Sequence, residues 1–270
     1  MPRSFSSQAL AAGLLASFVG FAGSFAVIIQ GLTAVGASRA EATSGLMALS
    51  IAMGLGAILL SLKTRMPISV AWSTPGAALL ATSGTLDGGF PAAIGAFLVT
   101  GALIFLAGLW KPLGRWVAAI PAPLANAMLA GVLLSLCLAP VKAVAAAPQL
   151  GLPVVLVWAV VARFKRLYAV PAAVAVTAAL VAMQGPGVAI PAASLWPHPI
   201  LIAPVFNFAA LAGIAVPLFI VTMASQNVPG IAVLNVNGYR PEPGPLFTIT
   251  GVFSLLAAPL GGHAVNLAAQ

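Results

Sequence analysis

The chain has 270 residues, of which 61% are apolar and only 5% are charged, and its mean hydropathy is +1.13. This composition excludes a soluble globular domain, because a membrane-spanning helix needs about 20 apolar residues and the chain offers many such runs. The net charge of +8 does not indicate a nucleic-acid partner, since the cations stand beside the apolar runs, as they do in membrane proteins.

Eight apolar runs predict membrane helices, and a ninth, interrupted segment lies between the second and the third run. The first run is longer than the apolar region of a secretory signal, so we interpret it as an uncleaved helix. In chain order the runs are Leu10–Leu32, Ser44–Leu62, Phe90–Trp110, Trp116–Ala139, Leu150–Ala162, Tyr168–Met183, Phe206–Val236 and Leu246–Leu260. We therefore expect an all-α polytopic membrane protein without soluble domains, in contact with the lipid bilayer.

The positions of the lysines and arginines predict how the chain crosses the membrane. With a cytoplasmic N-terminus and alternating crossings, only Arg39 and Lys142 of the eleven fall on the outer side. This asymmetry follows the positive-inside rule and predicts that the N-terminus is cytoplasmic. The nine cations on the inner side are Arg3, Lys63, Arg65, Lys111, Arg115, Arg163, Lys165, Arg166 and Arg240.

The interrupted segment Pro67–Thr82, PISVAWSTPGAALLAT, carries no charge and yet is not an ordinary membrane helix. Ile68–Ser73 alternates β-branched and polar residues, which suits extended backbone. Thr74 is a good N-cap, Pro75 suits the first helical position and Ala77–Ala81 favour a helix. A helix that begins inside the bilayer directs free N–H groups and a positive dipole end at a cavity, where transporters hold anions.

A proline-rich stretch, 185–204, divides the chain after seven predicted crossings. Because seven is odd, the segments that follow are expected in inverted topology. We predict a first inverted repeat in 1–184, an external loop in 185–204 and the start of a second repeat in 205–270. The glycine and proline residues of Pro259–Leu267 are predicted to open a second small-residue helix, and paired interruptions of this kind indicate a midplane binding site.

The three carboxylates, Glu41, Asp87 and Glu242, all lie in predicted loops. Without an embedded acid, a substrate that needs a negative partner, such as a metal cation or an amine, is disfavoured and an anion is favoured. Two histidines and one cysteine supply neither a nucleophile–base pair nor a set of metal ligands. We therefore expect no enzyme activity, no cofactor and no bound metal.

His263 is the one ionisable side chain predicted deep in the membrane, where burial is costly and a functional role is the default. It is interpreted as a proton carrier or a hydrogen-bond donor to substrate; the alternative is a neutral histidine bonded to a carbonyl. Gln226 and Asn227 line a cavity or bond neighbouring helices, and Pro229 nearby, which predicts a local kink, favours the cavity. Phe25 contacts an aromatic substrate or fills a gap between helices.

Three motifs closely resemble the signatures of the bacterial benzoate–proton symporter (BenE) family, and the resemblance runs over the whole chain. They are SVAWSTPGAALLA at Ser69–Ala81, MASQNVPG at Met223–Gly230 and GGHAVNLAA at Gly261–Ala269. The family looks related to nucleobase and sulfate transporters with a seven-plus-seven inverted-repeat fold. Membership implies an inner-membrane secondary transporter that holds substrate between two half-helices of a core domain, which moves against a gate domain. A homodimer is one assembly that the resemblance allows.

Carried over to this sequence, the resemblance puts Gln226 and His263 where nucleobase transporters have acidic residues. An amide and a histidine there agree with an aromatic carboxylate as substrate. Ser73, Thr74, Pro75 and Gly76 would form one half-helix mouth and Gly262 with His263 the other. The implied substrate-binding residues are Ser73, Thr74, Pro75, Gly76, Gln226, Asn227, Gly262, His263 and Phe25, and His263 is also the implied proton-coupling residue.

The sequence therefore predicts proton-coupled uptake of benzoate or a similar aromatic carboxylate. One alternative is a carrier of another small anion with the same fold. Another is a truncated remnant without transport activity, because family members are longer and this sequence ends at Gln270, inside the expected second half-helix.

Overall fold

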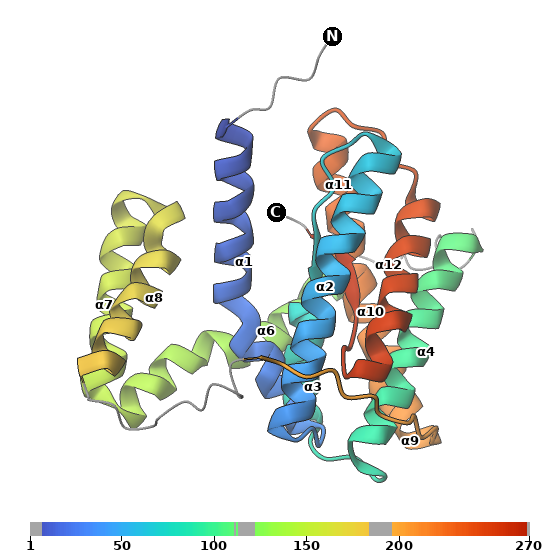
Figure 1. Cartoon of the computed structure of the whole chain (residues 1–270), viewed down its shortest axis with the longest axis horizontal. Helices are drawn as coiled ribbons and strands as arrows, with labels where there is room; N and C mark the ends of the chain where they lie inside the picture. The colour runs from blue at the N-terminus through green and yellow to red at the C-terminus, as the bar shows by residue number, and fades with distance from the viewer. Residues whose placement is uncertain (1–6, 111, 113–121, 184–195, 269–270) are drawn as a thin grey trace. The chain divides into compact units, whose positions relative to one another are not determined.

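The computed structural model describes residues 7–110, 112, 122–183 and 196–268, and within these ranges it is mostly helical (Figure 1). Six described helices are long and apolar enough to cross a membrane. They are Gly13–Ala34, Arg39–Thr64, Gly89–Leu109, Arg166–Met183, Phe208–Val236 and Pro243–Leu260. The chain is therefore a polytopic membrane protein, as its composition predicted, although the start of the predicted run Trp116–Ala139 lies outside the described residues.

The chain divides into two compact units, which are described separately. The first comprises 1–26 and 135–195, and the second comprises 27–134 and 196–270. In the first unit, α7 (Pro148–Phe164) and α8 (Arg166–Met183) pack on one another. The same unit holds most of α1 (Ser7–Ala34) and the second half of α6 (Ala122–Ala146). The two units are defined by compactness and not by an internal repeat. The inverted repeat expected in 1–184 and 205–270 therefore stays a prediction.

In the second unit, α12 (Pro243–Ala257) packs between α2 (Arg39–Thr64) and α4 (Gly89–Leu109) (Figure 1). Small residues permit this close approach: a Cβ on Gly251 of α12 would lie 2.6 Å from the Cα of Phe105 on α4. Apolar side chains fill the rest of the interface, and Phe97 and Ile104 of α4 are fully buried. Tight backbone contact of this kind is typical of helices that associate in a membrane.

The long helix Phe208–Val236 is interrupted twice. It consists of α9 (Phe208–Ala210), the π-helical turn η2 (Leu211–Ala215), α10 (Val216–Thr222), the π-helical turn η3 (Met223–Asn227) and α11 (Val228–Val236). A proline, Pro217 or Pro229, stands at the second position after each π-turn. Because proline has no N–H and crowds the preceding turn, it disturbs regular helical bonding there. The irregularity that the sequence predicted at Pro229 thus takes the form of a π-turn.

An extended, proline-rich segment, residues 196–207, crosses the ends of three elements. Its backbone N–H groups donate from Ile200 to Ser44 Oγ (2.9 Å), from Ile202 to the Pro259 carbonyl (2.8 Å) and from Val205 to the Pro91 carbonyl (2.9 Å). The described part of the predicted loop 185–204 is thus fixed to α2 and to the 3-10 turn η4 (Ala258–Leu260), and Val205 directly after it is fixed to α4. Its prolines suit this role, since they favour extended backbone.

The interrupted element Pro67–Thr82 is confirmed as a strand followed by a short helix. The strand β1 spans Val70–Trp72 and the helix α3 spans Thr74–Ser83. The N-cap is Ser73 rather than the predicted Thr74, and Pro75 is consequently the second helical residue. Ser73 takes the cap because its backbone is not helical and its hydroxyl accepts from the N–H of Gly76 at 3.1 Å.

The second predicted interruption is partly wrong. Pro259–Leu267 does contain a break, with the turn η4 followed by Gly261 at a φ of +97°. Instead of opening a small-residue helix, however, the chain continues as the strand β2 (Val265–Leu267), so Gly262 and His263 do not form a helix mouth. The reason is that β2 finds a partner: it pairs antiparallel with β1, with Ala71 opposite Asn266. The strands thereby satisfy backbone groups that apolar surroundings would leave unpaired.

Candidate functional site

At the centre of the second unit lies the antiparallel strand pair β1–β2, which we call the crossing. The hydrogen bonds at the two ends of this pair are equivalent. The N–H of Ser73, the residue after β1, donates to the carbonyl of Ala264, the residue before β2, at 3.0 Å. The N–H of Ala268, after β2, donates to the carbonyl of Ser69, before β1, at 2.9 Å. This local two-fold relationship makes Ala268, and not Gly262 or His263, the counterpart of the N-cap Ser73.

The helix α3 begins at this crossing and directs the positive end of its dipole there. Few of its first N–H groups are free. Gly76 donates to Ser73 Oγ, Ala77 donates to the Ser73 carbonyl at 2.8 Å, and Pro75 has no N–H. The N–H of Thr74 is the first-turn donor left without a partner in the described part of the chain, and Thr74 is half-buried. A ligand at this helix end would meet one N–H, one hydroxyl and the dipole.

His263 joins the turn before β2 to the start of α3. Its Nε2 lies 2.9 Å from the Ser73 carbonyl oxygen, and because a carbonyl only accepts, Nε2 carries the hydrogen. The ring is fully buried and meets Phe97 edge to face, with centroids 6.2 Å apart. Nδ1 is buried without a partner among the described residues. The carbonyl bond that the sequence analysis gave as the alternative for His263 is thus present, with a second nitrogen still unsatisfied.

Helix Phe208–Val236 carries three consecutive polar residues, Ser225, Gln226 and Asn227, which differ in burial. Asn227 is fully buried: its Oδ1 accepts from the N–H of Leu267 at 2.8 Å and its Nδ2 donates to Met223 Sδ at 3.0 Å. The hydroxyl of Ser225 donates within the helix to the Val221 carbonyl. Gln226, by contrast, is half-buried, and its amide makes no hydrogen bond with the described residues.

Side chains that the sequence analysis did not single out also fix the crossing. Thr222 Oγ1 lies 2.8 Å from Ser73 Oγ, and both residues are fully buried. Ser254 of α12 accepts from the N–H of Val265 at 2.9 Å, and Met53 Sδ accepts from the N–H of Trp72. A general signal was available for the two hydroxyls, because a buried hydroxyl in an apolar helix must find a partner.

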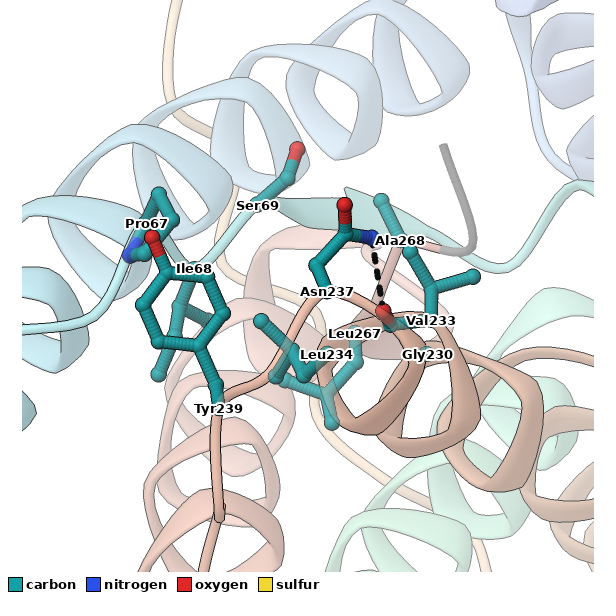
Figure 2. Close-up of a pocket in the computed structure, with 10 residues that line it drawn as sticks. All are labelled: Pro67, Ile68, Ser69, Gly230, Val233, Leu234, Asn237, Tyr239, Leu267 and Ala268. Atoms are coloured by element: carbon teal, nitrogen blue, oxygen red, sulfur yellow. Dashed lines mark hydrogen bonds between the residues drawn. The ribbon is translucent and has the colours of Figure 1, made fainter.

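A cavity of about 310 Å³ opens at the other end of the strand pair from Ser73 (Figure 2). Figure 2 shows its polar groups: Ser69, Tyr239 and Asn237, whose amide donates to the Val233 carbonyl at 2.8 Å. The remaining lining residues are Pro67, Ile68, Gly230, Val233, Leu234, Leu267 and Ala268. The predicted substrate-binding residues do not line this cavity.

The structure brings most of the predicted site residues to the crossing. Ser73, Pro75 and Gly76 are buried at the start of α3, and Gly262 and His263 are buried beside it. Gly262 is closely packed, since a Cβ there would lie 2.8 Å from the Cβ of Ala257.

Phe25 lies in the other unit, on α1, where its ring stacks on Phe21 with centroids 5.6 Å apart. Its place in a substrate site stays a prediction from the sequence.

The crossing is built from uncharged groups, as far as the structure describes it. Its polar atoms come from hydroxyls, amides, backbone and one imidazole. The carboxylates lie elsewhere: Glu41 caps the start of α2 by accepting from the Ser38 N–H at 2.8 Å, and Asp87 and Glu242 are exposed before α4 and α12. A helix dipole with neutral donors suits a singly charged anion better than a cation.

The chain is similar to known membrane transporters along almost its whole length. A family model described as "BenE: Benzoate membrane transport protein" matches residues 3–270. The chain belongs to the BenE family. The description of this family is that of a membrane transport protein, and the six described helices that are long and apolar enough to span a membrane agree with it.

Two curated relatives of this BenE family member are longer than this chain. "Inner membrane protein YdcO" from Escherichia coli (strain K12) is 41% identical over 261 residues, which are 96% of this chain and 66% of that protein. The "Benzoate membrane transport protein" of Acinetobacter baylyi (strain ATCC 33305 / BD413 / ADP1) is 28% identical over 273 aligned residues, which are 99% of this chain and 68% of that protein. The chain thus spans about two thirds of the length of these relatives. No solved structure matches the chain.

Proposed function

We propose that this protein takes up benzoate or a similar aromatic carboxylate together with a proton across the bacterial inner membrane. The observation that carries the proposal is the start of α3 at the strand crossing, where the Thr74 N–H has no partner among the described residues and the helix dipole is directed at uncharged groups. The names of the two relatives support the substrate and the membrane.

The carboxylate is held at the start of α3. The dipole offers about half a positive charge there, and the N–H and hydroxyl of Thr74 supply hydrogen bonds. The half-buried amide of Gln226 is a further donor on the helix that contacts Ser73. Ser73, Pro75, Gly76 and Gly262 are buried, so their part is to shape the helix start. Such a site compensates one negative charge and provides nothing for a second.

The proton is proposed to enter through His263. Its Nε2 is held by the Ser73 carbonyl, so a proton is gained or lost at Nδ1, which has no partner among the described residues. Protonation there places a positive charge beside the start of α3 and strengthens carboxylate binding. The inverted-repeat fold, the moving gate domain, the cytoplasmic N-terminus and a homodimer belong to the same proposal.

The test is uptake of isotope-labelled benzoate by the host bacterium, with the gene replaced at its own locus by each variant. We expect accumulation that collapses when the proton gradient is removed and that other aromatic acids inhibit more than aliphatic acids do. Gln226→Glu places a negative charge beside the carboxylate and should reduce uptake far more than Gln226→Asn, which keeps a neutral amide. Uptake that ignores benzoate but follows another small anion would reassign the substrate, and equal uptake by both Gln226 variants would remove Gln226 from the site.

A further inference from the structure

The π-turn η3 packs on the strand β2, and a polar side chain stands at each end of the turn. Thr222, just before the turn, contacts the N-cap Ser73 through the two hydroxyls at 2.8 Å. Asn227, the last residue of the turn, accepts from the N–H of Leu267 in β2 at 2.8 Å. One helix therefore contacts the β1–α3 junction and β2 separately.

The π-turn explains how two residues five positions apart reach neighbouring strands. In an α-helix the backbone bond runs from residue i to i−4, so residues four apart lie above one another. In a π-turn the bond runs over five residues, as it does here from the Val228 N–H to the Met223 carbonyl. Residues five apart, such as Thr222 and Asn227, then share a face. Regular α-helix would turn Asn227 away from that face.

The amide of Asn227 has little left to offer a ligand. Its side chain is fully buried, its oxygen is bonded to Leu267 and its nitrogen to Met223 Sδ. The contact with Met223 orients the amide so that the oxygen faces β2. Thr222 is likewise fully buried and bonded to Ser73. Both side chains are thus bonded to groups that build the site, and neither is exposed to a bound ligand.

We propose that Thr222 and Asn227 are positioning residues that clamp the strand crossing onto helix Phe208–Val236 and so set the start of α3 relative to Gln226. The assignment rests on the proposed transport function for its effect on uptake, but the clamp itself is a property of the fold. Thr222 holds the N-cap whose hydroxyl also binds the Gly76 N–H, and Asn227 holds the strand that pairs with β1. Loss of either contact frees one half of the crossing.

The clamp is tested by a disulfide that reports strand register without transport. Val70 and Leu267 lie directly opposite one another, so Val70→Cys with Leu267→Cys should form a disulfide on oxidation, in a Cys137→Ala background. Asn227→Leu should lower the disulfide yield and raise the KM for benzoate uptake about fivefold, the ratio expected from one lost buried hydrogen bond. Thr222→Val should raise the KM similarly, whereas Thr222→Ser keeps the hydroxyl and should restore it.

Ser225→Ala is the matched control, because among the described residues the Ser225 hydroxyl bonds only within its own helix. It should leave both disulfide yield and KM unchanged. The clamp is overturned if Asn227→Leu leaves the disulfide yield at the unsubstituted level, or if Thr222→Val and Thr222→Ser behave alike. Absence of benzoate uptake in the unsubstituted protein would instead contradict the proposed function, and the disulfide yields would still decide the clamp.

Discussion

Ser73 and His263, 190 positions apart in the sequence, are joined by a 2.9 Å hydrogen bond from the imidazole Nε2–H to the Ser73 carbonyl oxygen. The same carbonyl accepts the N–H of Ala77, the first bond that closes α3. The histidine therefore acts on the helix start through its N-cap. A change in the protonation of His263 would therefore affect a substrate held at Thr74 through Ser73.

Two replacements of His263 distinguish its hydrogen bond to Ser73 from its proposed role in proton coupling. His263→Ala leaves the Ser73 carbonyl with one bond fewer and empties a fully buried position, so we expect the free energy of unfolding to fall by about 1–3 kcal/mol and uptake to be lost. His263→Gln restores an N–H donor but does not titrate near neutral pH. It should recover stability and benzoate binding while uptake loses its dependence on the proton gradient. Uptake by His263→Gln that still follows the gradient would assign the proton to another group.

The cap of α3 gives a second prediction. Ser73→Ala removes the hydroxyl that accepts from Gly76 and contacts Thr222, which should cost about 1 kcal/mol for the cap alone. The loss is measured as unfolding in mixed micelles, and the KM for benzoate should rise. Ser83→Ala is the matched control, because within the described part of the chain that exposed hydroxyl bonds only to the Leu79 carbonyl, at the other end of α3. Equal losses in the two variants would contradict a special role for the cap.

The sequence predicted the helical membrane architecture, because long apolar runs leave few alternatives in lipid. It also predicted the strand and short helix of Pro67–Thr82, since proline and a capping hydroxyl mark a helix start locally. The error of one residue at the cap reflects two adjacent hydroxyl residues, Ser73 and Thr74, both of which can cap a helix, with serine somewhat the better of the two. Which of them caps depends on the backbone angle that pairing with β2 imposes on Ser73.

The strand β2 was missed for a different reason. His263–Leu267 mixes apolar and polar residues much as Ile68–Ser73 does, and the same argument for extended backbone would have applied. The prediction instead placed the start of a second helix at Gly262, by analogy with α3. This is several residues before Ala268, the counterpart of Ser73 in the structure. The π-turn at Met223–Asn227 had no comparable signal beyond Pro229, because the extra residue is visible only through the partners that Thr222 and Asn227 find in the fold.

Ser44 tests how the turn before His263 is held. Its fully buried hydroxyl accepts from the Ile200 N–H and donates to the Leu260 carbonyl, both at 2.9 Å. Ser44→Ala leaves both backbone groups without a partner, so we expect the free energy of unfolding to fall by about 1–3 kcal/mol. Ser50→Ala removes a hydroxyl whose one partner in the described structure is the Leu46 carbonyl of the same helix, and should have little effect. Faster proteolysis near Ile200 in Ser44→Ala, but not in Ser50→Ala, would locate the loosened segment.

Gly76 gives the last prediction, because its lack of a side chain lets α3 approach α10. A Cβ at Gly76 would overlap the Cδ1 of Leu218 and lie 2.7 Å from Ser73 Oγ. Gly76→Ala should therefore cost about 1–3 kcal/mol through overpacking, and should raise the KM for benzoate by displacing the cap. Adding Leu218→Ala provides room, so the double variant should recover part of the affinity, and the two effects should not add. Gly54→Ala is the control, since a Cβ there meets nothing within 4 Å and alanine favours the helix. Gly76→Ala and Gly54→Ala with the same KM would show that this close approach does not set the position of the α3 start.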